Sequence, residues 1–501
     1  FIEYSIFNKS HWKSYVEVNK KFASCVIQNA KKGDIVWIHD YQLLLCPKII
    51  KNERPDLTVG FFLHIPFPSF EIFRIFPWRE KLLEGILGAD LIGFHTYDYV
   101  RHFLSSVKRI LRYNVVFNKI EVDSREVLVD TFPMGIDYLK FFNSAKQKLN
   151  QKKSEMSKLR VKLKDHKKNS ADSKLILSID RLDYTKGVIN RIKAFEIFLT
   201  NFPEYRDKVR LVMLTVPSRS DVDDYKKLKK QTDEIVGRVN GKFASVNWTP
   251  IWYYYRTMNF DELIDLYTIS DIAMITPVRD GMNLVAKEFV ATRVKGDGVL
   301  ILSEMAGASK ELYESLTVNP FDLNDMSNVI FKAINMPEKE QIKRNKSMQT
   351  RLSRYTVNYW ANDFMKNLIS RGKSNLKSIT NIFDISEINK LIDKLKLSSK
   401  KLIILDYDGT LVNFKDNPEL AIPDDNLIKI LKNLTSIKGL DVAIVSGRDK
   451  LFLENNLAEL DITLIAEHGH FYKKKNKNWK NLGVIDNGFL DEIYSILQSF
   501  S

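Results

Sequence analysis

The chain has 501 residues, of which 44% are hydrophobic and 28% are charged, so it has the composition of a globular protein and the length of two or three domains. No apolar run reaches the roughly eighteen residues that a membrane helix needs, which excludes a membrane-spanning protein. The two cysteines, Cys25 and Cys46, are too few for a disulfide framework or a cysteine metal cluster, and they predict a cytoplasmic location.

Apolar segments of strand length recur along the chain, and each is followed by a helical stretch. The first group comprises residues 34–40, 57–65, 90–95 and 126–136, and the second comprises 174–180, 208–216, 270–278 and 298–305. Because these segments are apolar throughout, they indicate parallel strands covered on both faces. Two such sets predict two doubly wound α/β domains, whose ligands bind beyond the carboxyl ends of the strands.

A basic segment, residues 146–168, separates the two groups and carries much of the net charge of +15. Its apolar residues Leu149, Met156, Leu159 and Leu163 indicate an amphipathic helix with a solvated basic face. Binding to nucleic acid or anionic lipid is the alternative. Aromatic residues are not interleaved with the lysines and no nucleic-acid motif accompanies them, so the solvated helix is favoured.

Polar residues follow the strand of segment 276–294, "TPVRDGMNLVAKEFVATRV". Gly281 permits a tight turn, and a helix is predicted to begin near Met282, where exposed amides favour an anion. Asp280 and Glu288 are placed to accept hydrogen bonds from sugar hydroxyls. The alternative is a capped helix with a surface glutamate.

Two cations follow another strand, in "SIDRLDYTKGV". Arg181 offers a planar fork and Lys186 a mobile point charge, which together suit a diphosphate whose charge grows as a bond breaks. In the first domain Asp40 and His64 each end an apolar run, where a polar group is costly unless it is used. Solvated cations and a structural histidine are the alternatives.

The motifs together resemble one family of retaining glycosyltransferases, the trehalose-6-phosphate synthases. The resemblance rests on "WIHDYQL", "GFFLHIPFPSFEIF", "GADLIGFHTYDYVRHF", "SIDRLDYTKG", "TPVRDGMNLVAKEF" and "LSEMAGA". It implies the GT-B fold, two Rossmann-like domains with the active site between them. It also implies transfer of glucose from UDP-glucose to glucose 6-phosphate, giving trehalose 6-phosphate and UDP, without a metal in the synthase site.

The resemblance also assigns residues to the donor and the acceptor. On the donor side it places Arg181 and Lys186 at the diphosphate, Glu288 at the ribose, Met258 beside the uracil, and Asp280 with the amides of Gly281, Met282, Asn283, Leu284 and Val285 at the transferred glucose and the phosphates. His64 contacts the glucosyl hydroxyl farthest from the ring. Asp40 orients the acceptor, and Arg219 holds its phosphate. The expected catalytic set is Asp40, His64, Arg181, Lys186 and Asp280.

Near the end of the chain, "KLIILDYDGTLV" and "AIVSGRD" resemble haloacid-dehalogenase phosphatases and, beside a synthase, the trehalose-6-phosphate phosphatases. The resemblance makes Asp406 the nucleophile and Asp408 the general acid and base, and it places Ser446 at the phosphoryl group. A Mg²⁺ ion would be shared by Asp406 and the backbone of Asp408. A surface turn with two aspartates is the alternative.

The expected domains are an incomplete acceptor domain (1–140), a nucleotide-sugar domain with a closing helix (141–370), a linker (371–395) and the first part of a phosphatase domain (396–501). The sequence is therefore interpreted as a fragment of a bifunctional synthase–phosphatase. Its expected partners are UDP-glucose, glucose 6-phosphate and trehalose 6-phosphate, without nucleic acid or membrane, and a homo-oligomer is left open. A catalytically silent scaffold that binds sugar phosphates is the alternative.

Overall fold

A computed structural model describes residues 5–122, 125–168, 173–219, 221–377, 385–413, 415, 418–474 and 477–481. The chain forms two compact units, Phe1–Thr380 and Asn381–Ser501, each described here by itself. Within the described ranges, no helix is long and apolar enough to cross a membrane.

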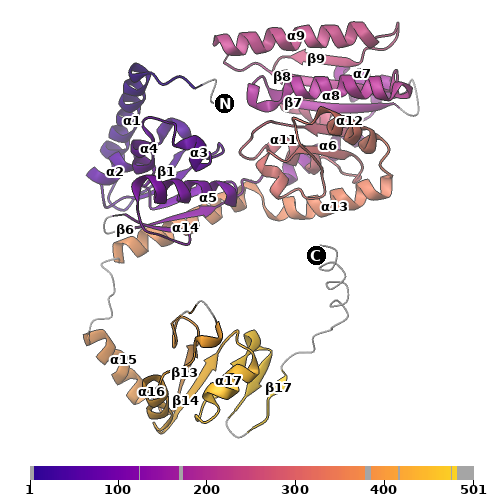
Figure 1. The fold of residues 1–501 in the computed structure, drawn as a ribbon. Coiled ribbons are helices and arrows are strands. Elements are labelled where there is room, and N and C mark those ends of the chain that lie inside the picture. Colours follow the sequence, from indigo (N-terminus) through magenta and orange to yellow (C-terminus); the bar gives the residue numbers. More distant parts are fainter. Residues whose placement is uncertain are drawn as a thin grey trace. The chain divides into compact units, whose positions relative to one another are not determined.

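The first unit contains two lobes, each built on a six-stranded sheet (Figure 1). The sheet of the first lobe has the order β1-β2-β3-β6-β5-β4, with β1, β2, β3 and β6 parallel. Its elements are α1 (Lys9–Asn29), β1 (Ile35–His39), α2 (Cys46–Glu53), β2 (Thr58–Phe62), α3 (Phe70–Phe73), α4 (Arg79–Ile86), β3 (Leu91–Phe94), α5 (Tyr97–Ser106), β4 (Val115–Val116), β5 (Lys119–Val122) and β6 (Arg125–Thr131). All four apolar segments predicted for this lobe form strands, and the antiparallel β4–β5 hairpin is additional.

The sheet of the second lobe has the order β12-β11-β10-β7-β8-β9, and all its strands are parallel. Its elements are α6 (Tyr138–Asn150), α7 (Lys158–Lys168), β7 (Lys174–Arg181), α8 (Val188–Asn201), β8 (Val209–Val216), α9 (Asp223–Phe243), β9 (Ile251–Tyr255), α10 (Phe260–Ile269), β10 (Ile272–Ile275), α11 (Leu284–Ala291), β11 (Val299–Ser303), β12 (Leu316–Val318), α12 (Leu323–Ile334) and α13 (Glu338–Arg354). The chain order reverses between β10 and β7, and ligands of such sheets bind at that point.

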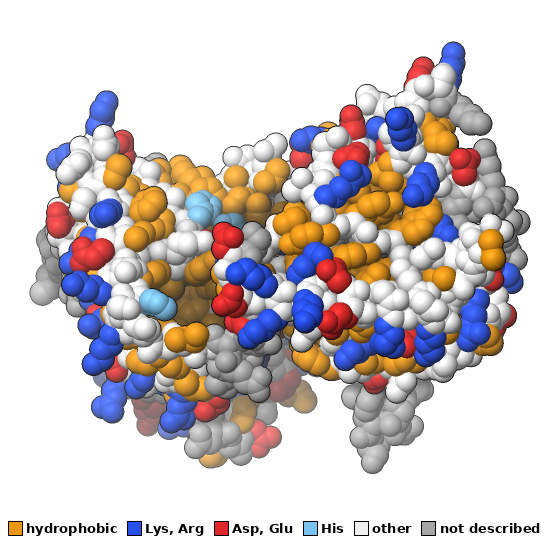
Figure 2. Space-filling model, turned by 90° about the horizontal axis from the view of Figure 1, so that it is seen from above, with side chains coloured by type: hydrophobic (Ala, Val, Ile, Leu, Met, Phe, Trp, Pro, Cys, Tyr) orange, Lys and Arg blue, Asp and Glu red, His pale blue; other side chains and the backbone are white. Residues whose placement is uncertain are grey.

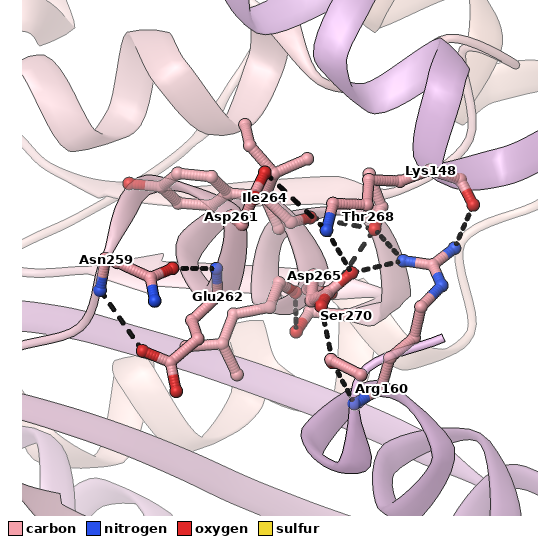
Figure 3. Close-up of polar contacts among 12 residues, drawn as sticks. Lys148, Arg160, Asn259, Asp261, Glu262, Ile264, Asp265, Thr268 and Ser270 are labelled. Carbon is pink, nitrogen blue, oxygen red and sulfur yellow. Dashed lines mark hydrogen bonds and ion pairs between the residues drawn. The ribbon is translucent and has the colours of Figure 1, made fainter. Parts of the chain in front are cut away.

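The basic segment 146–168 differs from the single solvated helix that was predicted. α6 ends within it and α7 begins only at Lys158, after a short 3-10 turn. Arg160 is 1% exposed and donates to Asp265 of α10 at 3.0 Å (Figure 3). The basic segment therefore contains one buried arginine that ties it to α10. The sequence could not show this, because the spacing of the apolar residues does not reveal which basic side chain pairs with an acid elsewhere in the chain.

A last helix of the unit, α14 (Val357–Lys377), returns to the first lobe and packs on its sheet (Figure 1). Its Phe364 and Leu368 fit against β2 and β3 because Gly60 and Gly93 carry no side chain there. A Cβ at Gly60 would lie 2.7 Å from Leu368, and one at Gly93 would lie 2.8 Å from Phe364. The chain therefore crosses between the lobes twice, after β6 and before α14, which fixes the two sheets within one unit.

The second unit has one sheet in the order β13-β14-β15-β16-β17, of which the first three strands are parallel. Its elements are α15 (Ile385–Leu397), β13 (Lys401–Asp406), α16 (Asp425–Thr435), β14 (Leu440–Val445), α17 (Lys450–Leu457), β15 (Thr463–Ala466), β16 (Phe471–Lys473) and β17 (Lys480–Asn481). One face of β13 is open, since Leu402 is 61% and Ile404 63% exposed. Asp406 ends this strand.

Candidate active site

The predicted site residues of the first unit meet where the carboxyl edges of the two sheets face each other. Asp40 and His64 follow β1 and β2, whereas Asp280 follows β10. The Tyr99 hydroxyl of the first lobe donates to the backbone oxygen of Asp280 at 3.2 Å, and a Cβ at Gly281 would lie 2.0 Å from the backbone oxygen of His64. Seen from above, the surface is hollowed between the lobes, with acidic and basic side chains gathered beside the hollow (Figure 2).

Lys186 and Asp280 form the most direct polar contact of the site. The ammonium of Lys186 lies 2.5 Å from Oδ2 of Asp280, and both side chains are 14% exposed. Asn283 donates to the same oxygen at 2.9 Å. The cation predicted to bind a diphosphate and the acid predicted to bind sugar hydroxyls are therefore neighbours, although they are 94 residues apart in the chain.

The fully buried side chain of Arg191 stabilises the loop that carries Lys186 through hydrogen bonds. Arg191 donates to the backbone oxygen of Lys186 at 3.0 Å, to Asp180 at 2.8 Å and to Thr276 at 3.1 Å. Gly187 closes the loop at φ 66°, where a Cβ would lie 2.4 Å from the backbone oxygen of Thr276. The backbone after β7 is thus locked to the backbone after β10.

The anion-binding turn begins α11 at Leu284, two residues later than the sequence predicts. Asn283 is the N-cap at φ 75°, and its side chain accepts from the amide of Ala286 at 3.2 Å. The side chains of Met282, Leu284 and Val285 pack in or against the core of the lobe, so these residues can contribute only backbone amides to a ligand. The amide role assigned to Gly281, Met282, Asn283, Leu284 and Val285 stays a prediction.

Glu288 lies one turn into α11 and is held by Tyr267 of α10. The tyrosine hydroxyl donates to Oε2 of Glu288 at 2.6 Å. Burial raises the pKa of Glu288 from its ordinary value, and burial also raises the pKa of Tyr267 well above its own. Met258 precedes α10 and is partly buried against the same core. The residues predicted to lie at the ribose and at the uracil therefore belong to α11 and to the segment just before α10.

The two arginines of the predicted site are placed differently. Arg181 is exposed at the end of β7, and its side chain makes no hydrogen bond or ion pair within the described part of the chain. Arg219, at φ 46°, donates to Tyr41 of the first lobe at 2.7 Å and to Tyr225 at 3.1 Å. Tyr225 donates in turn to Asp183 at 2.9 Å. Arg219 therefore reaches across to the lobe that carries Asp40.

Three histidines line the first-lobe side of the site. His39 Nδ1 lies 3.0 Å from His64 Nε2, and the ring of His64 is 5.4 Å from that of His95. Burial lowers the pKa of His39 and of His64, and it lowers the pKa of His95 to about 3. The three imidazoles therefore favour the neutral form near pH 7, in which His64 is an uncharged hydrogen-bonding group.

Asp40 has an unusual backbone conformation, φ 68° and ψ 172°. Such angles are strained for any residue with a side chain. They are held by two hydrogen bonds. The amide of Asp40 donates to Phe62 at 2.8 Å, and its carboxylate accepts from the amide of His64 at 3.3 Å. This conformation directs the carboxylate of Asp40, at the end of β1, toward His64 at the end of the neighbouring strand β2.

The predicted phosphatase residues lie together at the ends of β13 and β14. Asp408 is paired with Arg448, whose nitrogens lie 2.6 and 2.9 Å from its two oxygens, and Asp406 accepts from Thr410 at 3.0 Å. Ser446 is buried and accepts from the amide of Arg448 at 3.1 Å. Within the described residues, no three acidic, histidine or cysteine side chains form a metal-binding group, so the two aspartates alone do not complete a Mg²⁺ site.

Sequence reasoning missed the residues that hold the site in place. Tyr267 and Arg191 lie within helical runs and look like ordinary core and surface positions. Tyr41 follows directly on Asp40 in "WIHDYQL", and that adjacency was a usable signal. For Tyr267 and Arg191, only the packing of α10 on α11 and of α8 on the sheet reveals the role.

Known proteins match both units. Residues 2–370 match glycosyltransferase family 20, and residues 404–500 match trehalose-phosphatase. A bifunctional trehalose-6-phosphate synthase/phosphatase of Thermoproteus tenax is 44% identical over all of this chain and 68% of its own length. The UDP-forming alpha,alpha-trehalose-phosphate synthase A of Dictyostelium discoideum is 40% identical over 92% of this chain. This chain spans 62% of that relative's length.

Solved structures match the first unit. A UDP-forming alpha,alpha-trehalose-phosphate synthase from Burkholderia xenovorans in complex with glucose-6-phosphate is 31% identical, with a TM-score of 0.68 over 72% of this chain and 80% of that one. A protein from E. coli bound with UDP-2-fluoro glucose is 32% identical, with a TM-score of 0.69 over 73% and 80%. The predicted twin-lobed GT-B fold, with a phosphatase-like domain after it, is confirmed.

Proposed function

The chain belongs to glycosyltransferase family 20, and we propose that it transfers glucose from UDP-glucose to glucose 6-phosphate with retention, giving trehalose 6-phosphate and UDP. The observation that carries this proposal is the contact of Lys186 with Asp280, because it brings a phosphate-binding cation to the acid that would hold the sugar. The complex of a relative with glucose-6-phosphate supports the acceptor, and that of another with UDP-2-fluoro glucose supports the donor.

The geometry suits catalysis by positioning and charge stabilisation. Lys186, Arg181 and the amides at the start of α11 would hold the diphosphate while negative charge develops on it. Asp280 and His64 would fix the glucosyl hydroxyls, and Asp40 with Arg219 would orient the acceptor from the opposite lobe. The leaving phosphate would take the acceptor's proton, so the proposal includes neither a protein nucleophile nor a metal.

For the second unit we propose a trehalose-6-phosphate phosphatase site, with Asp406 as nucleophile and Asp408 as general acid and base. The pairing of Asp408 with Arg448 supports a fixed position for that carboxylate. Mg²⁺ belongs to this proposal only together with acidic ligands beyond the two aspartates. A cytoplasmic location, in keeping with two unpaired cysteines, is part of the same proposal.

The test incubates the chain with UDP-glucose and glucose 6-phosphate and follows UDP release and the sugar product. Trehalose 6-phosphate is expected, and Lys186→Ala should lower UDP release by about 10²- to 10³-fold or more, as when other transition-state charge contacts are removed. Lys230→Ala, on the exposed face of α9, is the matched control and should leave the rate unchanged.

Two outcomes would contradict the proposal. Binding of both sugars without UDP release would favour the silent scaffold, and normal turnover by Lys186→Ala would refute the donor assignment. Release of trehalose and inorganic phosphate in the presence of Mg²⁺ would support an active second unit as well.

A further inference from the structure

Tyr267 has the geometry of a residue that acts on the nucleotide through another side chain. Its hydroxyl donates to Oε2 of Glu288 at 2.6 Å, and its side chain is only 1% exposed. Within the described residues the carboxylate of Glu288 has no other hydrogen-bond or ion-pair partner, so its second oxygen, Oε1, is left for a ligand. We propose that Tyr267 is a positioning residue that fixes the Glu288 carboxylate for the ribose hydroxyls, an inference that rests on the proposed donor site.

Polar contacts fix α10, the helix that carries Tyr267, at its start and in its middle (Figure 3). At its start Asn259 and Glu262 form a reciprocal capping box, with hydrogen bonds of 2.9 and 3.1 Å. In its middle Asp265 accepts from Arg160 at 3.0 Å, and both side chains are 1% exposed. A shift of α10 would break this buried ion pair, so the Tyr267 hydroxyl is presented to Glu288 from a rigid support.

The chemistry of the contact favours one protonation arrangement. A buried phenol hydroxyl is a hydrogen-bond donor, and the acceptor it suits best is an ionised carboxylate. Without this donor, Glu288 would be a partly buried carboxylate free to change rotamer or to take a proton. A ribose diol needs acceptors in a fixed place, so the tyrosine contributes to ribose recognition without touching the nucleotide.

The experiment measures, by calorimetry, the affinities of UDP and of 2′,3′-dideoxy-UDP, which lacks both ribose hydroxyls. The wild-type chain is compared with Tyr267→Phe, Glu288→Gln and the control Tyr205→Phe, which removes a tyrosine hydrogen bond to Asn335 elsewhere in the lobe. Wild type and control should prefer UDP by about 10- to 100-fold, the range of hydrogen bonds to charged groups.

Tyr267→Phe should weaken UDP binding by about 5- to 10-fold and leave dideoxy-UDP binding unchanged, because only the ribose contact is affected. In turnover, the KM for UDP-glucose should rise while kcat and the KM for glucose 6-phosphate stay within twofold. Circular dichroism establishes which variants are folded, and a phenylalanine variant of lowered stability is compared with the wild type at a lower temperature.

The outcomes separate this inference from the function beneath it. If the wild-type chain does not distinguish the two nucleotides, or Glu288→Gln still does, the ribose role of Glu288 is wrong. If Glu288→Gln loses the distinction and Tyr267→Phe keeps it, the positioning role of Tyr267 is wrong. Equal weakening of both nucleotides by Tyr267→Phe would indicate a purely structural residue and would also overturn the inference.

Discussion

The two sides of the proposed active site, the donor side and the acceptor side, are built in different ways. On the donor side, Lys186 and Glu288 are each held by a deeply buried side chain, Arg191 and Tyr267. On the acceptor side, Asp40 is held by backbone hydrogen bonds, and Arg219 by Tyr41 of the opposite lobe as well as by Tyr225 of its own. The difference suggests that the donor site is formed in advance within one lobe, whereas the acceptor site depends on how the lobes meet.

The strongest test of the donor half is removal of its buried support. Arg191→Met would leave Asp180, which is 6% exposed, without its ion-pair partner, and breaking a buried pair in this way costs about 3–5 kcal/mol. Urea unfolding measures the loss. Arg238→Met removes an exposed pair with Glu196 and should cost less than about 1 kcal/mol. Similar losses of stability in the two variants would contradict the view that a buried side chain supports the donor side.

The contact between the two lobes at Gly281 can be disrupted by adding one carbon atom. In Gly281→Ala the new Cβ would meet the backbone oxygen of His64 at 2.0 Å, so the lobes must move apart. A displacement of about 1 Å at reacting groups costs on the order of 10²-fold in kcat/KM. The control is Gly237→Ala, in α9 with nothing within 4 Å, which should leave the rate unchanged and stabilise the helix by about 0.5–1 kcal/mol. Unchanged turnover by Gly281→Ala would show that this contact between the lobes does not set the geometry of the reacting groups.

The pH dependence of the free energy of unfolding tests the first-lobe side of the contact between the lobes. Burial lowers the pKa of His95 to about 3, so below pH 6.5 the unfolded chain takes up a proton that the folded chain refuses. The stabilisation is therefore complete above pH 6.5 and declines by about 1.4 kcal/mol for each pH unit below it. His95→Gln should lose about 2 kcal/mol less than wild type between pH 7 and pH 5 in urea unfolding. Equal losses would place the acid sensitivity elsewhere.

The smallest effect is expected at the contact between lobes on the acceptor side. Tyr41→Phe removes the 2.7 Å hydrogen bond from Arg219, a partly exposed contact worth about 1 kcal/mol. The KM for glucose 6-phosphate should rise by roughly three- to tenfold, while UDP affinity stays constant. An effect on UDP affinity of the same size would mean that the two halves are not independent.

The sequence allowed much of the fold to be predicted, because parallel strands are marked by local apolar runs. It also singled out Asp280 and Lys186 as candidate site residues, since polar residues at strand ends stand out against those runs. It could not identify Tyr267, whose partner lies 21 residues away on another helix. Nor could it separate Arg160 from its basic neighbours, because burial of one cation depends on Asp265, more than one hundred residues later.

The left-handed backbone at Asp40 has a consequence for attempts to improve this protein. A glycine would adopt φ 68° without steric cost, and relief of such strain is worth about 1–3 kcal/mol. Asp40→Gly would relieve this strain, but it would also remove the carboxylate proposed to orient the acceptor, together with its hydrogen bond from the His64 amide. Selection for stability alone can therefore act against the proposed acceptor site, so libraries built for stability should keep this position fixed.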